Sequence, residues 1–266
     1  MASRLLQRVD PSRLRSLAVI AAIIGLFAGV VAATFASVAG EPAIEDATAI
    51  EEANPAAHRE PEADDAHGDE ASVARSDQRG FGLFGAYALT GAVFGALLAL
   101  TAHGLRRGRP DPTGRVLLAG VVLAGAFTVA PWLKYPPNPP AVGNPSTLGQ
   151  RQWLYVAVIC IAAAVALGAT MVSRRMRAAG WADHRRIVTV AAAVTVPMLL
   201  VFAVLPPAPD EVVIPATLVW RFRVASLGAN LTLWAVLTLG VGWWVGEAAR
   251  RADADAADRQ SIPSLA

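Results

Sequence analysis

The sequence predicts an all-α polytopic membrane protein with six transmembrane helices. Of the 266 residues, 55% are hydrophobic and only 17% are charged, whereas an ordinary soluble domain carries about 25% charged residues. The apolar residues are gathered in runs of about 18 or more, and a helix of that length crosses the hydrocarbon layer of a bilayer. Basic residues also alternate in abundance between successive connections. We therefore predict three helical hairpins with both termini in the cytoplasm.

Six apolar segments are the candidate spans, and they leave too little polar sequence for a separate soluble domain. They cover residues 17–38, 81–103, 115–133, 153–172, 187–205 and 224–246. We expect a single membrane domain over residues 1–266, with residues 247–266 as a cytoplasmic tail. The first segment follows several arginines, as a signal peptide would. Its apolar core exceeds the roughly 7–15 residues of a signal, so we interpret it as an uncleaved first helix.

The distribution of charge sets the predicted orientation. With the N-terminus in the cytoplasm, 16 of the 23 basic residues fall on the inner side and 14 of the 21 acidic residues on the outer side. An excess of arginine and lysine in cytoplasmic connections is typical of inserted helices. Six of the seven tryptophans also lie at span ends, where their rings suit the headgroup level. A multi-pass membrane protein is therefore the expectation.

A proline-rich segment, residues 131–140 (PWLKYPPNPP), separates the third and fourth spans. It contains five prolines and the single lysine of the chain, Lys134. Proline ends a helix and favours extended backbone, which must lie at a surface or line a wet cavity. We predict that Trp132 and Tyr135 anchor this outer turn at the interface and that Lys134 extends to the headgroups.

The connection between the fifth and sixth spans is also rich in proline, and arginines follow it at the start of the sixth span. Arg221 and Arg223 are expected to pair with Asp210 and Glu211 or with lipid phosphate. Farther along the same span, Asn230 has two interpretations. Its oxygen could contact a passing ion, or its amide could join two helices.

The first outer connection, residues 40–80, is long, acidic and poor in large apolar residues, so we expect it to be largely disordered. Asp65, His67 and Asp69 alternate within it, and His58 lies nearby. Carboxylates and imidazoles bind divalent cations, and imidazole favours the later first-row metals. The loop is therefore either a metal-collecting segment or a solvated acidic segment that serves only solubility.

A second acidic group follows the first span directly. Glu41, Glu45 and Asp46 have helical spacing, so they are expected to lie near one another at the outer mouth of the protein. Negative charge at a mouth concentrates cations. We count these three residues with the loop as candidate metal contacts.

Motifs of the common enzyme classes do not occur in the sequence. It contains no GxSxG, HExxH, CxxC or P-loop pattern, and no Asp or Glu lies at the centre of a span. We predict that the protein is not an enzyme and has no tightly bound cofactor. The basic isoelectric point reflects the cytoplasmic arginines, so nucleic acid is not an expected partner, whereas membrane lipid is.

Three stretches resemble the CbtA family of cobalt transporter subunits, in the form found in actinobacteria. The first is residues 41–47 (EPAIEDA), followed by an acidic loop with histidines. The second is residues 134–143 (KYPPNPPAVG), leading to residues 150–152 (QRQ). The third is residues 213–218 (VIPATL) with residues 222–227 (FRVASL).

This resemblance implies a multi-pass subunit of a bacterial inner membrane for uptake of a divalent transition-metal cation. The implied ion is Co²⁺, with Ni²⁺ or another divalent cation as alternatives. It also implies a small single-span partner of the CbtB type. Many family members carry a dense histidine run in the first outer loop, whereas this chain has His58 and His67. The alternative function is a subunit that scaffolds a membrane complex without transporting an ion.

Overall fold

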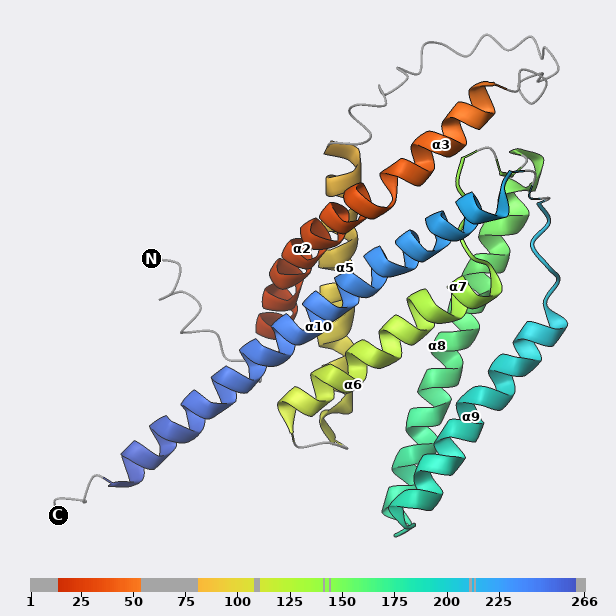
Figure 1. The fold of residues 1–266 in the computed structure, drawn as a ribbon. Coiled ribbons are helices and arrows are strands. Elements are labelled where there is room, and N and C mark those ends of the chain that lie inside the picture. The colour runs from red at the N-terminus through yellow and green to blue at the C-terminus, as the bar shows by residue number, and fades with distance from the viewer. Residues whose placement is uncertain are drawn as a thin grey trace, which may run out of the picture. The chain divides into compact units, whose positions relative to one another are not determined.

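A computed structural model of the chain describes residues 14–53, 81–107, 111–140, 142–143, 145–210, 212 and 214–261. Every regular element in these ranges is helical, as predicted. The α-helices are α2 (Leu14–Ala39), α3 (Glu41–Glu52), α5 (Leu83–Gly104), α6 (Pro112–Ala124), α7 (Ala130–Lys134), α8 (Leu148–Ala178), α9 (Asp183–Val204) and α10 (Ala216–Ser261). The shorter turns are η3 (Leu105–Arg107), the π-helical η4 (Gly125–Val129) and η5 (Pro145–Thr147) (Figure 1).

Six helical segments among the described residues are long and apolar enough to cross a membrane. They are Leu14–Ala39, Leu83–Gly104, Pro112–Lys134, Leu148–Ala178, Asp183–Val204 and Ala216–Asp258. The third combines α6, η4 and α7, because the π-helical turn continues the helix with a wider backbone instead of ending it. The predicted count of six candidate spans is confirmed.

The described residues form two compact units. The first unit takes its residues from Met1–Ala32, Phe84–Val122 and Thr232–Ala266, and the second from Ala33–Leu83 and Leu123–Leu231. Within each unit, helices pack through small and apolar side chains.

In the first unit, α2 and α5 approach each other through glycine. A Cβ atom on Gly25 would overlap the carbonyl oxygen of Gly91, and one on Gly91 would overlap that of Gly25. Gly29 and Gly95 are equally crowded by opposing backbone. Small residues let helix backbones pack closely where lipid offers no hydrophobic driving force. The same unit contains Trp234, the one tryptophan distant from a span end, which stacks on Phe94 with ring centroids 4.6 Å apart.

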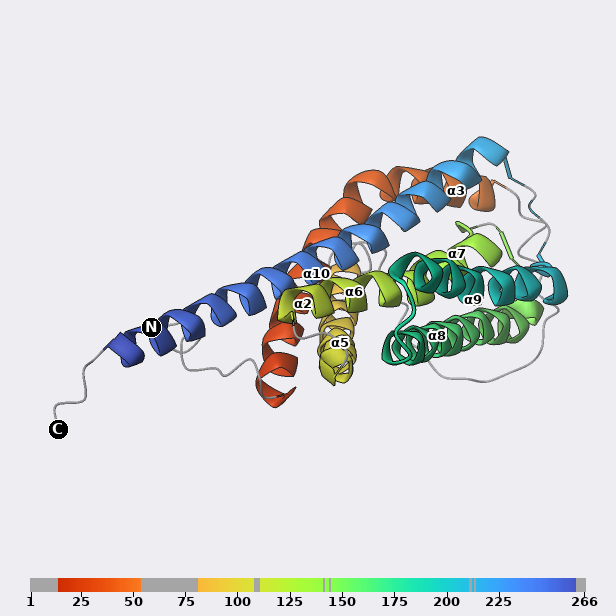
Figure 2. The same cartoon turned by 90° about the horizontal axis from the view of Figure 1, so that it is seen from below.

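In the second unit, α8 and α9 pack side by side (Figure 2). The turn between them begins with Gly180 at φ +72°, a left-handed conformation that favours glycine. The amide of Trp181 donates to the Met176 carbonyl, and that of Gly180 donates to the Arg177 carbonyl. These bonds satisfy carbonyls at the end of α8 and stop the helix at this point.

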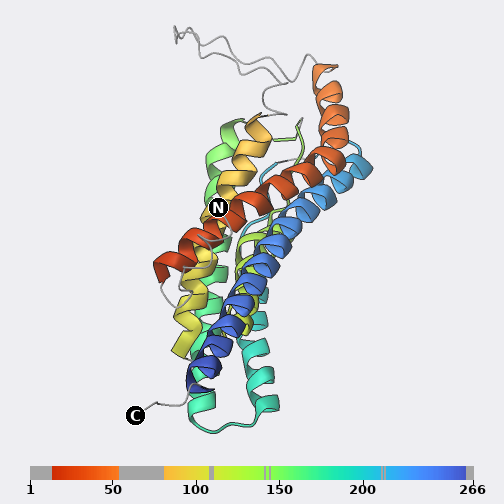
Figure 3. The ribbon, with the colours of Figure 1, turned by 90° about the vertical axis from the view of Figure 1, so that its left-hand side faces the viewer.

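A second contact of this unit joins α3 to the start of α10. After the end of α2, the chain bends at Gly40 and continues as α3 (Figure 3). Ala43 and Ala47 on one face of α3 are buried against Leu218 and Val219. Because these alanines recur at a spacing of four residues, α3 buries a narrow stripe and leaves its acidic residues on its other sides.

Candidate functional site

The acidic residues at the start of the first outer connection lie on α3. Glu41, Glu45 and Asp46 are all within this helix, so their predicted helical spacing is confirmed. Glu41 stands in the first turn, where a carboxylate complements the positive end of the helix dipole. The candidate ligands His58, Asp65, His67 and Asp69 lie outside the described residues.

Asp46 pairs with an arginine of α10. Its Oδ2 atom lies 3.2 Å from Nη1 of Arg221, and both side chains are 57% exposed. A pair so open to solvent contributes little stability, but it lowers the net negative charge of α3. Within the described part of the chain, no group of three or more His, Cys, Asp or Glu side chains is placed to hold a metal ion.

The proline corner, residues 131–143, is bound to the end of α9. Nζ of Lys134 donates to the carbonyl oxygens of Phe202 at 3.1 Å and Leu205 at 2.8 Å. The Tyr135 hydroxyl donates to the Pro206 carbonyl at 2.7 Å. The last carbonyls of a helix have no partner within the helix, and they attract a cation. Lys134 therefore satisfies the C-terminus of α9, where we had predicted an extension to the headgroups.

The aromatic residues of this corner are also held by the protein. Tyr135 is buried together with Val158 and Val201, and burial raises the pKa of its hydroxyl above the usual value. Nε1 of Trp132 donates to the Arg223 carbonyl at 3.0 Å. Their polar groups thus bond to backbone carbonyls. Anchoring of these two rings at the membrane interface stays a prediction.

A buried carboxylate connects the two proline-rich connections. The Asp210 side chain is only 1% exposed, and its Oδ2 lies 3.1 Å from Nε of Arg151. The Thr147 hydroxyl donates to Asp210 Oδ1 at 2.6 Å. Gly143, at φ +127°, lies against the Arg151 guanidinium, and a side chain there would collide with it.

This arrangement corrects the predicted pairing of Asp210. We expected Arg221 and Arg223 to pair with Asp210 and Glu211 or with lipid phosphate, but Arg151 is the arginine that lies against Asp210. Glu211 lies outside the described residues. A buried carboxylate is stable only where an opposite charge and hydrogen-bond donors replace the water it has lost. Here Arg151 in the first turn of α8 supplies the charge, and Thr147 at the end of η5 supplies a donor.

Arg223 binds the proline corner instead. Its Nη2 donates to Asn138 Oδ1 at 2.7 Å, and its Nε donates to the Pro137 carbonyl at 3.4 Å. The sequence analysis did not identify Asn138. The proline content of this corner could have predicted such a contact. Prolines lack an N–H donor, so the carbonyls of a proline-rich segment need a donor from elsewhere, such as arginine.

Asn230, the candidate pathway residue, is half-buried in α10. Its Nδ2 donates to the Ser226 carbonyl one turn earlier at 2.9 Å. That bond uses one donor of the side-chain amide, which has two donors and an acceptor.

The polar residues around the proline corner therefore form a fixed frame. Lys134, Arg151 and Arg223 each tie one segment of the second unit to another, and each bonds to a carbonyl or carboxyl oxygen. Acidic side chains with solvent exposure lie on α3 of the same unit. The basic residues thus hold backbone segments of the second unit in place, while α3 presents negative charge to solvent. The contacts described here include no nucleophile paired with a base.

Comparison with curated proteins gives no match, and comparison with solved structures gives none. One family model, described as "Probable cobalt transporter subunit (CbtA)", matches residues 14–246. The match covers all six candidate spans apart from the end of α10. It confirms the resemblance seen in the sequence, and six apolar helices agree with a multi-pass membrane protein. The chain belongs to the CbtA family of cobalt transporter subunits.

Proposed function

We propose that this protein is the membrane subunit of an uptake system for a divalent transition-metal cation, with Co²⁺ as the ion. The observation that carries the proposal is the family match over residues 14–246 together with six membrane-length helices. The proposed form is a single membrane domain in a bacterial inner membrane, with three helical hairpins and both termini cytoplasmic. Residues 247–266 form the cytoplasmic tail, and a small partner of the CbtB type completes the transporter.

The proposed first step is collection of the ion at the segment 40–80. Glu41, Glu45 and Asp46 on α3 raise the local cation concentration, and carboxylates and imidazoles of the following loop bind the ion. His58 and His67 are the imidazole donors, with Asp65 and Asp69 beside them. Exposure of Asp46 supports an electrostatic role, because an exposed carboxylate acts on ions in solution.

The proposed role of the proline corner is to hold the path next to the collecting segment open. Its prolines lack N–H donors, and Arg223 from α10 binds its Pro137 carbonyl. Asn230 is the candidate oxygen donor deeper in the membrane, and ligands from the partner subunit complete the path. A carbonyl- and amide-lined path suits a cation that exchanges its water ligands one at a time.

Uptake of radioactive Co²⁺ tests this function in cells that express the chain with and without its small partner. Two variants test the collection step: His58→Ala/His67→Ala and Glu41→Gln/Glu45→Gln. Asp253→Asn/Asp255→Asn in the C-terminal part of α10 is the matched control, because it also removes two carboxylates. We expect chain-dependent uptake that falls in both collecting variants and stays normal in the control.

Other outcomes would change the proposal in defined ways. Chain-dependent uptake that is unchanged in both collecting variants would support transport but contradict the collecting role of residues 40–80. Uptake of Ni²⁺ in preference to Co²⁺ would change the ion. No chain-dependent uptake of Co²⁺, Ni²⁺ or Zn²⁺ would replace transport with the scaffold function.

A further inference from the structure

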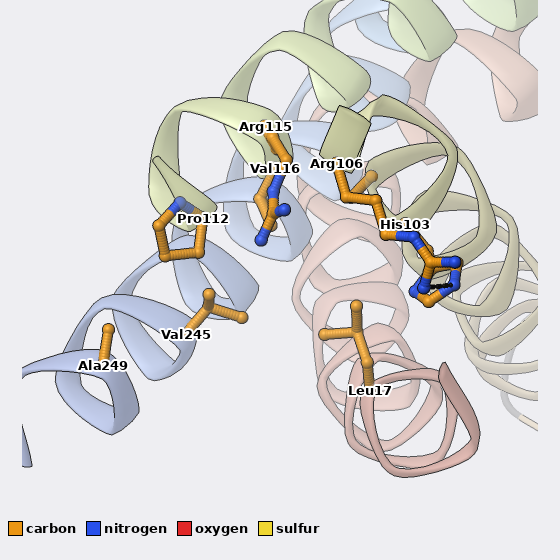
Figure 4. A pocket seen from close by; sticks show the side chains of 9 residues that line it. Leu17, His103, Arg106, Pro112, Arg115, Val116, Val245 and Ala249 are labelled. Atoms are coloured by element: carbon orange, nitrogen blue, oxygen red, sulfur yellow. Dashed lines mark hydrogen bonds between the residues drawn. The ribbon is translucent and has the colours of Figure 1, made fainter. Parts of the chain in front are cut away.

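A cavity in the first unit has the features of a phosphate site. Its volume is about 370 Å³, and it is lined by residues of α2, α5, η3, α6 and α10 (Figure 4). This volume lies at the lower end of the roughly 300–1,000 Å³ that small-molecule sites occupy. The described residues that line the cavity include none of those proposed to collect or pass cobalt.

The polar side chains that line this cavity, among the residues the structure describes, are basic. They belong to Arg106, Arg115 and His103, and none of the described lining residues carries a carboxylate. Nη1 of Arg106 lies 2.5 Å from Nε2 of His103. That contact positions the guanidinium while occupying one of its five N–H donors. Figure 4 shows the Arg115 side chain reaching toward the cavity from α6.

The acidic residues nearest in sequence are engaged elsewhere. Both carboxylate oxygens of Asp111 accept backbone amides at the start of α6, from Thr113 and Gly114. Glu247 on α10 binds Arg250 and Arg251. The guanidinium of Arg115 forms no ion pair with any carboxylate in the described ranges. Among the described residues, no carboxylate therefore pairs with the Arg115 guanidinium, and a bound anion could accept from its N–H donors.

The rest of the lining is apolar. Leu17, Val116 and Val245 form part of the wall from three different helices. A free inorganic anion would leave this apolar wall in contact with water. An anion attached to an apolar group would bury the wall, which is favourable. Guanidinium groups match phosphate because their N–H donors are planar and pair with two oxygens.

We propose that this cavity binds a phosphate group through Arg106 and Arg115, and that its apolar wall receives the remainder of a phospholipid. The basic ends of these helices are predicted to face the cytoplasm, where anionic lipid is available. A soluble phosphate compound shares the headgroup chemistry, so the test separates the two sources. The proposal does not depend on cobalt transport.

The experiment measures lipid retained by the full-length protein in native mass spectrometry from detergent. The probes are dioleoylphosphatidylglycerol, dioleoylglycerol without phosphate, and glycerol phosphate without acyl chains. Arg106→Gln/Arg115→Gln is compared with Arg175→Gln/Arg185→Gln, which also removes two arginines, both exposed and on α8 and α9. Ala249→Phe, which fills the cavity and keeps both arginines, is a second variant.

We expect wild type and the Arg175/Arg185 control to retain phosphatidylglycerol. Loss of two charge-assisted contacts should weaken retention by at least about tenfold in Arg106→Gln/Arg115→Gln. Ala249→Phe should weaken it as well, and dioleoylglycerol should not be retained. Equal retention of dioleoylglycerol, or equal losses in both arginine pairs, would overturn the site. Displacement of the lipid by millimolar glycerol phosphate would overturn the lipid as the source and leave a soluble phosphate compound.

Discussion

Nε of Arg151 lies 3.1 Å from Oδ2 of Asp210, and the carboxylate it faces is almost completely shielded from water. The two residues come from different connections, so this pair joins the start of α8 to the segment after α9. Thr147 binds the other carboxylate oxygen. The frame around the proline corner therefore includes a buried carboxylate that both Arg151 and Thr147 contact.

Replacing Arg151 with Met should destabilise the second unit, because the Asp210 carboxylate would remain buried without its charge partner. Removing one member of a buried pair costs about 3 kcal/mol. Asp210→Asn should cost less, since the neutral amide can still accept the Thr147 hydroxyl. Thermal unfolding in detergent measures both. Arg185→Gln, at an exposed site on α9, is the control, and an equal effect there would contradict the role of burial.

The contact between Gly25 and Gly91 makes a second prediction. Gly91→Ala should disrupt packing of α2 on α5, because the added methyl would overlap the backbone of Gly25. Gly85 lies on the same helix with open space around its Cβ position. Gly85→Ala should therefore be tolerated, with up to about 1 kcal/mol gained from helix propensity. The two variants are compared by the yield of folded protein and by its melting temperature. Equal yields and melting temperatures would contradict the close contact between Gly25 and Gly91.

The six helices were predictable because length and hydropathy alone determine whether a segment can span a bilayer. The pairings around the proline corner were not. Arg223 binds Asn138, 85 positions away, whereas we had expected a carboxylate such as Asp210, or lipid phosphate, as its partner. Charge patterns indicate which groups need partners, but backbone geometry decides which of several arginines reaches a given oxygen. His58 and His67 stay predictions, as do the three hairpins and the orientation.

Lys134 should stabilise the end of α9. Lys134→Met keeps an apolar stem of similar length but removes the donor to the Phe202 and Leu205 carbonyls. Charge-assisted bonds contribute about 1.5–3 kcal/mol each, with less expected at a half-buried position. Hydrogen exchange should accelerate in the last turn of α9 and remain unchanged at the start of α8. Unchanged exchange in that turn would indicate that Lys134 does not satisfy these carbonyls.

Tyr135 should make stability depend on pH in the alkaline range. Burial raises its pKa in the folded protein, so the protonated hydroxyl is favoured in the folded state. This contribution is complete below the unfolded pKa of about 10 and is lost as pH rises through the folded pKa. Tyr135→Phe removes both the titration and the bond to Pro206. Wild type should be more stable than the variant by about 1 kcal/mol at neutral pH, and the difference should shrink above pH 10.

Asp46 and Arg221 should have opposite effects on uptake at low Co²⁺ concentration. Both are exposed and lie within ion-pair distance, so either change has little effect on folding. Asp46→Asn removes a negative charge from α3 and should slow uptake, whereas Arg221→Gln removes the neutralising charge and should accelerate it. The change should be about twofold in each direction at low ionic strength and smaller at high salt, because screening shortens the range of the field. Arg250→Gln, which also removes one arginine from α10, should leave the rate unchanged. Parallel effects of the Asp46 and Arg221 variants would point to a structural role for the pair and contradict electrostatic collection at α3.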